Sequence, residues 1–149
     1  MNEKPGMSII VKTTCRIILW VVFLYGFYII LFGHLSPGGG FGGGVVLALG
    51  FLSIVLAYGR SYALDWLSIP RLEKAEAGAV LLFLVIALLG VVAGGAFLQN
   101  FMSKGSLFHL YSSGVIPFLN IVIGLKVGLS LFLVAWALTE YDSEDGDEE

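Results

Sequence analysis

Four long apolar segments dominate the chain, over about residues 9–32, 43–58, 75–98 and 114–138. A hydrocarbon layer of about 30 Å is crossed by roughly 20 helical residues. Three segments are long enough alone, and 43–58 is long enough if the glycine-rich residues before it are included. The runs lack the alternation of barrel strands, and lipid offers no partner to free backbone groups. We therefore predict an all-α integral membrane protein with four transmembrane helices.

The composition supports this fold class. Apolar residues make up 58% of the 149 residues, and the mean hydropathy is +0.93, more than a soluble domain of this size could bury in one core. Basic residues precede the first segment, but that segment is too long for a secretory signal and no small-residue cleavage site follows it. We expect it to remain as the first span.

Basic residues predict the orientation. With four spans, the N-terminus, the loop between the second and third spans and the C-terminus share one side of the membrane. The opposite side carries only Lys104, whereas the shared side carries Lys4, Lys12, Arg16, Arg60, Arg71 and Lys74. Because basic residues favour the cytoplasmic side, we predict that both termini are cytoplasmic, in a multi-pass protein of the cell membrane.

The chain divides into a membrane domain, residues 1–139, and an acidic tail, residues 140–149. The tail has seven acids and no base, which is typical of a disordered, solvated segment, although it could instead meet a basic patch on a partner. Residues 60–76 mix aromatic and charged side chains and suit a segment lying in the membrane interface. Ser68 and Ser113 are placed to cap the third and fourth helices.

Lys126 lies at the centre of the last segment, with about twelve residues on either side. At a rise of about 1.5 Å per residue, it is roughly 18 Å from either helix end, beyond the reach of its side chain. A cation there costs from about 3 to above 10 kcal/mol, so it normally faces a bundle interior, a wet cavity or a carboxylate. We expect no Asp or Glu of this chain at membrane depth, so that a carboxylate partner would come from another subunit. A role in an ion path and a structural role both stay open.

Other polar residues are candidates to line an ion path with Lys126. Asn120 and Ser130 lie on the same predicted helix, and Ser130 follows Lys126 by one turn on the same face. His34 could relay protons, because histidine titrates near neutral pH, or it could form hydrogen bonds within a loop. Glu76 suits the positive end of the third helix, and a functional role is the alternative.

A glycine-rich motif separates the first two spans. It consists of Pro37, Gly38, Gly39, Gly40, Phe41, Gly42, Gly43 and Gly44. So many glycines disfavour regular helix. The motif is either a flexible turn that lets a neighbouring subunit pack closely or a broken, re-entrant segment whose backbone groups line a wet cavity. Nucleotide binding is rejected, since no βαβ unit and no Gly-Lys-Ser/Thr accompany the glycines.

Small residues at four-residue spacing predict packing faces on the last two spans. These are Gly90 and Gly94 on the third, and Gly124 and Gly128 on the fourth. Such pairs let helix backbones approach closely in a membrane.

Side chains for catalysis or metal binding are lacking in the sequence. Cys15 has no activating neighbour, and the two histidines have no Asp or Glu at ligand spacing. We therefore expect a non-catalytic chain with no metal and no cofactor. Its expected partners are other membrane subunits and the lipid bilayer, and no nucleic acid.

The segment from Gly33 to Gly43, together with the segment from Asn120 to Val127, resembles the B subunit of Mrp-type multisubunit sodium/proton antiporters. The resemblance covers most of the chain but not the acidic tail. Lys126 and the glycine motif lie at matching positions, whereas Gly42 stands where members often have a bulkier residue.

The resemblance implies a small four-helix subunit of a hetero-oligomeric antiporter. The larger subunits carry the principal antiporter helices, so this chain would support or line the cation and proton path. Homologous modules occur in membrane-bound hydrogenases and related respiratory complexes. The alternative is therefore a structural, non-catalytic subunit of a redox-driven ion pump.

Overall fold

The computed structural model describes residues 7–103, 105–106, 109 and 112–145. These residues form helices and no strands: α1 (Ile9–Leu31), α2 (Gly39–Tyr58), α3 (Arg60–Trp66), α4 (Ile69–Val92) and α5 (Ile116–Asp145). The helices α1, α2 and α4 and the part of α5 from Ile116 to Thr139 are long and apolar enough to cross a membrane. The predicted all-α fold with four spans is confirmed for this part of the chain.

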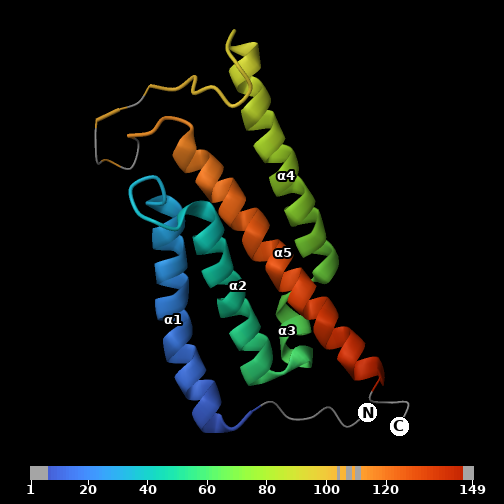
Figure 1. Ribbon diagram of the computed structural model, residues 1–149. Coiled ribbons are helices and arrows are strands. Elements are labelled where there is room, and N and C mark those ends of the chain that lie inside the picture. The colour runs from blue at the N-terminus through green and yellow to red at the C-terminus, as the bar shows by residue number, and fades with distance from the viewer. Residues whose placement is uncertain (1–6, 104, 107–108, 110–111, 146–149) are drawn as a thin grey trace.

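Helix α2 packs between α1 and α5, and α4 packs against α5 (Figure 1). The start of α1, the end of α5 and the short helix α3 lie at the same end of the bundle, as an even number of spans requires (Figure 1). The cytoplasmic orientation of this end stays a prediction. Lys4 and Lys104, which contribute to that prediction, lie outside the described residues.

Helix α4 begins at Ile69, directly after the predicted cap residue Ser68, and ends at Val92, about six residues before the end of the predicted apolar segment near residue 98. Pro70 fits the first turn because its missing N–H has no acceptor there. Ser68 takes the N-cap position without a side-chain hydrogen bond. The helix ends because Gly94 adopts a φ of 83°, a left-handed conformation that glycine tolerates and that closes many helices. Gly94 therefore terminates α4 and does not extend a packing face along it.

Helix α5 differs from the prediction at both ends. It begins at Ile116, after Gly114 at a φ of 61°, so Ser113 lies outside it. It continues to Asp145, so helical backbone extends into the first residues of the predicted tail. Extending an existing helix fixes one residue per hydrogen bond and is cheaper than nucleating one. The division at residue 139 stays a prediction, and residues 146–149 lie outside the described part.

Helix α3 covers the end of the α2–α5 pair. Ala63 of α3 is buried in a cluster with Val55, Phe132 and Trp136, and the Arg60 guanidinium lies 4.7 Å from the Trp136 ring centroid. This distance suits a cation–π interaction. Of the predicted interfacial segment, residues 60–66 thus form a short helix that packs on the bundle, and residues 69–76 form the first turns of α4.

The glycine motif is helical from Gly39 onward, which corrects the expectation that it would avoid regular helix. Added Cβ atoms on three of its glycines would meet backbone: on Gly40 the Cβ would meet the Asn120 carbonyl oxygen, and on Gly44 it would lie 2.7 Å from the Gly124 carbonyl oxygen. On the other side, a Cβ on Gly43 would lie 2.9 Å from the Gly26 carbonyl oxygen. These glycines let α2 pack tightly against α1 and α5 of the same chain. One of the two predictions had been that they make room for a neighbouring subunit.

Two glycines of α2 give a matched test of this packing. Gly44→Ala places a methyl group 2.7 Å from the Gly124 carbonyl oxygen, whereas Gly42→Ala meets no atom within 4 Å. We expect Gly44→Ala to lower the free energy of unfolding by about 1–3 kcal/mol through overpacking. Gly42→Ala should raise it by about 0.4–1 kcal/mol, because alanine restricts the unfolded chain. Thermal unfolding in detergent measures both, and equal melting temperatures would contradict the packing.

Candidate functional site

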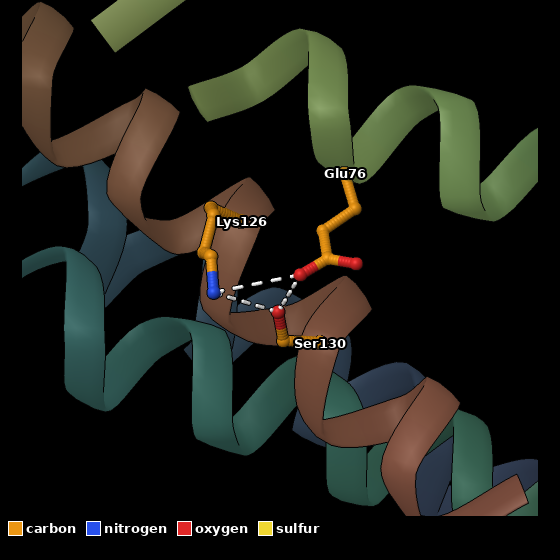
Figure 2. Close-up of polar contacts among 3 residues, drawn as sticks. All are labelled: Glu76, Lys126 and Ser130. Atoms are coloured by element: carbon orange, nitrogen blue, oxygen red, sulfur yellow. Dashed lines mark hydrogen bonds and ion pairs between the residues drawn. The ribbon is translucent and has the colours of Figure 1, made fainter. Parts of the chain in front are cut away.

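Three polar side chains meet between α4 and α5. Lys126 and Ser130 come from successive turns of α5, and Glu76 reaches them from α4 (Figure 2). Lys126 Nζ donates a hydrogen bond to Ser130 Oγ at 2.9 Å, and Ser130 Oγ donates one to Glu76 Oε1. Lys126 Nζ and Glu76 Oε1 are 3.4 Å apart and form an ion pair. We call these three residues the Lys126 cluster.

The Lys126 cluster corrects the expectation that a carboxylate partner of Lys126 would come from another subunit. Helix α4 begins at Ile69, so Glu76 lies seven residues, or about 10 Å, into the helix. Its partner Lys126 lies ten residues into the candidate span Ile116–Thr139, so the contact brings Glu76 next to the middle of that span. The carboxylate partner of Lys126 is therefore supplied by this chain.

The two charges of the Lys126 cluster are paired but not enclosed by this chain. The Lys126 side chain is 41% exposed and the Glu76 side chain 30% exposed. Pairing offsets part of the cost of holding charges away from water, although desolvation can exceed the attraction. Ser130 adds a hydrogen bond to each partner, and these bonds offset more of the desolvation cost.

An apolar cavity of about 250 Å³ adjoins Lys126 between α4 and α5. Its walls come from both helices, and its lining residues are Ala79, Val80, Phe83, Val122, Ile123, Lys126 and Val127. Lys126 is the one charged residue among them. The cluster therefore lies at the edge of a groove with apolar walls.

His34 and Asn120 lie apart from the Lys126 cluster, at the end of the bundle where α5 begins. His34 Nε2 is 3.4 Å from the His109 carbonyl oxygen, which joins the α1–α2 loop to the segment before α5. His34 Nδ1 and Asn120 Nδ2 are buried without a hydrogen-bond partner among the described residues. Of the five predicted ion-path candidates, the structure thus brings together Glu76, Lys126 and Ser130.

The remaining candidates have packing positions or exposed positions. Gly124 and Gly128 face Gly44 of α2, and Gly90 lies against the turn that follows α4. Phe41 is 64% exposed on the surface of α2, and Pro37 is exposed in the α1–α2 loop.

Small buried residues mark the face of α4 that carries Glu76. Ala79 and Ala87 are the buried alanines of α4, and they follow Glu76 by three and eleven residues. These spacings place all three on one helix face. The sequence alone does not single out this face, because Ala75, Ala77 and Gly78 put equally small residues on other faces of the helix. The pairing of Glu76 therefore became visible only with the packing of α4 on α5.

Comparison with known proteins identifies the family. A family model described as the domain related to the MnhB subunit of Na+/H+ antiporter matches residues 10–133. The chain belongs to this family. The resemblance found in the sequence is thereby confirmed, and this MnhB-family chain is a multi-pass membrane protein.

Individual relatives agree with the MnhB assignment. The B subunit of a Na+/H+ antiporter of Bacillus subtilis is 32% identical over 100 residues, which cover 67% of this chain and 69% of the relative. An uncharacterised protein of Methanocaldococcus jannaschii is 38% identical over 120 residues, which cover 76% of this chain and 45% of the relative. The chain therefore spans less than half the length of that archaeal relative.

A solved structure has the same fold. It is a chain of the membrane-bound sulfane sulfur reductase, an archaeal respiratory membrane complex, with a TM-score of 0.73 and 28% sequence identity. The match covers 90% of this MnhB-family chain and 60% of that chain.

A double-mutant cycle tests the ion pair. Glu76→Gln and Lys126→Met each leave one charge without its partner, whereas the double variant removes both charges. We expect the double variant to be more stable than the sum of the single effects predicts, by on the order of 1 kcal/mol, because both side chains are partly exposed. Thermal unfolding of the four purified proteins measures this coupling.

Glu73 provides the matched control for this cycle. It is an exposed glutamate one turn before Glu76 on α4. The effects of Glu73→Gln and Lys126→Met should add. Additive effects of Glu76→Gln and Lys126→Met would show instead that the ion pair contributes nothing.

Proposed function

We propose that this chain is a membrane subunit of a multisubunit Na+/H+ antiporter, in which the Lys126 cluster lines or supports the cation and proton path. The observation that carries the proposal is the ion pair between Lys126 and Glu76, which joins two membrane-spanning helices. Ionisable groups within membrane spans are costly and typically mark ion and proton pathways. The similarity to the B subunit of the Bacillus subtilis antiporter supports the same function.

The hydrogen bonds of the cluster suit proton transfer. Ser130 Oγ accepts a hydrogen bond from Lys126 and donates one to Glu76. If Ser130 Oγ takes a proton from the ammonium and passes its own proton to the carboxylate, the ion pair becomes a neutral amine and a carboxylic acid.

Glu76 is also the group of the cluster that a metal cation would approach. Hard cations prefer carboxylate and other oxygen ligands. A sodium ion near Glu76 would compete with the Lys126 ammonium for the same carboxylate. One site would then respond to both the proton and the cation, as an exchange path requires.

We also propose where the chain lies and which molecules it contacts. Its partners are other membrane subunits, its two termini are cytoplasmic, and it lies in the cell membrane. The chain itself is non-catalytic and needs no metal or cofactor.

A second candidate function follows from the fold match to a chain of an archaeal respiratory membrane complex. In that case the chain would be a structural subunit of the antiporter module in a redox-driven ion pump. The Lys126 cluster would then stabilise the contact between α4 and α5 without handling ions.

Lys126→Ala tests the proposed function. The variant is expressed with the other subunits, and sodium-dependent proton movement is followed with a pH-sensitive dye in inverted membrane vesicles. We expect the complex to assemble and the exchange rate to fall at least tenfold, because Glu76 loses the cation that balances its charge. Lys74→Ala, which removes an exposed lysine two residues before Glu76, should retain the wild-type rate.

The outcomes of this assay separate the two functions. Wild-type exchange by an assembled Lys126→Ala complex would remove Lys126 from the ion path. Mass spectrometry of the purified complex identifies the host, because iron–sulfur or nickel–iron proteins among its subunits would favour the redox-driven pump.

A further inference from the structure

The Lys126 cluster lies on a face that the described helices leave partly open. Helix α4 packs against α5, while α2 packs between α5 and α1 (Figure 1). The side chains of Lys126 and Glu76 remain 41% and 30% exposed. Contact between lipid hydrocarbon and charged side chains costs free energy even when the charges are paired. Lipid is therefore a poor cover for this part of the molecule.

The cavity beside Lys126 indicates the size of what covers it. Its volume of about 250 Å³ is below the roughly 300–1,000 Å³ of typical ligand and cofactor sites. It is nonetheless large enough for a big side chain, since a cavity of about 150 Å³ accepts benzene. Phe83 and Val80 form part of an apolar wall. The cavity matches one apolar side chain inserted from a neighbouring helix.

The exposed apolar side chains elsewhere on α4 do not show whether a protein or lipid covers them. Leu81, Val85 and Leu88 are 63%, 45% and 46% exposed. Lipid tails are as apolar as these side chains, so their exposure drives no helix association. The two observations that require a protein neighbour are the exposed charges and the side-chain-sized cavity, and they lie side by side.

The hydrogen bonds of the cluster indicate the chemistry of that neighbour. A lysine ammonium has three donors. In the cluster one is directed to Ser130 and one to Glu76, which leaves one donor. Oε1 of Glu76 holds the contacts within the cluster, so Oε2 remains as an acceptor among the described residues. Because the pair is already neutral, the best complement is an uncharged side chain that both donates and accepts, such as Ser, Thr, Asn or Gln.

We propose that a membrane-spanning helix of a partner subunit lies in the groove between α4 and α5. It inserts an apolar side chain into the cavity and places a hydroxyl or amide side chain against Lys126 and Glu76. This inference rests on the proposed function, because it requires a multisubunit membrane complex. It also assigns the α4–α5 face, among the exposed surfaces of the bundle, as the contact that closes the ion path against lipid.

Photo-crosslinking in the intact complex tests this contact. The photoreactive residue p-benzoylphenylalanine replaces Val80, which lines the cavity and is 50% exposed. Leu81 is the matched control, since it lies on the same helix at the same depth but outside the cavity lining. We expect Val80 to form one protein adduct, mapped by mass spectrometry to a membrane-spanning helix of another subunit. The yield at Leu81 should be at least fivefold lower.

Several results would overturn the inference: lipid adducts alone at Val80, an adduct with a second copy of this chain, or equal yields at Val80 and Leu81. If the Val80 variant fails to assemble, Phe83 provides the second position, because the probe replaces one aromatic cavity residue with another. A complex that exchanges sodium for protons but gives only lipid adducts would overturn this inference alone. Purification of the chain without other membrane subunits would overturn the proposed function as well.

Discussion

The ion pair between Glu76 and Lys126 is the interaction on which the candidate site of this chain depends. A lysine at the middle of a membrane-spanning helix requires a counter-charge or water, because hydrocarbon solvates neither. Helix α4 supplies the counter-charge at 3.4 Å from the ammonium. Among the described helices α4 packs mainly against α5. The pair therefore satisfies Lys126 at the contact between α4 and α5.

Helix α5 divides its surface between two neighbours. One face carries Gly124 and Gly128 and meets the glycines of α2, where an added Cβ on Gly124 would lie 3.2 Å from the Gly40 carbonyl oxygen. The other face carries Lys126 and Ser130 and meets α4 (Figure 2). Close backbone packing on one side fixes the rotation of α5, and that rotation directs its polar side chains toward α4. The glycine motif thus contributes to the site without touching its charged groups.

The sequence predicted the four spans and the family, because the spans are continuous apolar runs and the family leaves two short motifs, Gly33 to Gly43 and Asn120 to Val127. It did not predict the pairing of Glu76 with Lys126. A cap at Ser68 puts the glutamate in the first turns of the helix, but only the packing of α4 on α5 decides which part of α5 those turns meet. The helical glycines of α2 were missed for a related reason. Glycine disfavours helix in isolation, but here its missing side chain allows two helices to approach and tertiary packing decides the outcome.

The most direct test of the Glu76–Lys126 pairing is an experimental structure of the chain within its complex, determined by electron cryo-microscopy at a resolution that shows side chains. We expect Glu76 to lie inside the membrane region, with its carboxylate within hydrogen-bond distance of Ser130 and beside the Lys126 ammonium. A structure in which Glu76 lies at the headgroup level and Lys126 pairs with a carboxylate of another subunit would contradict this pairing.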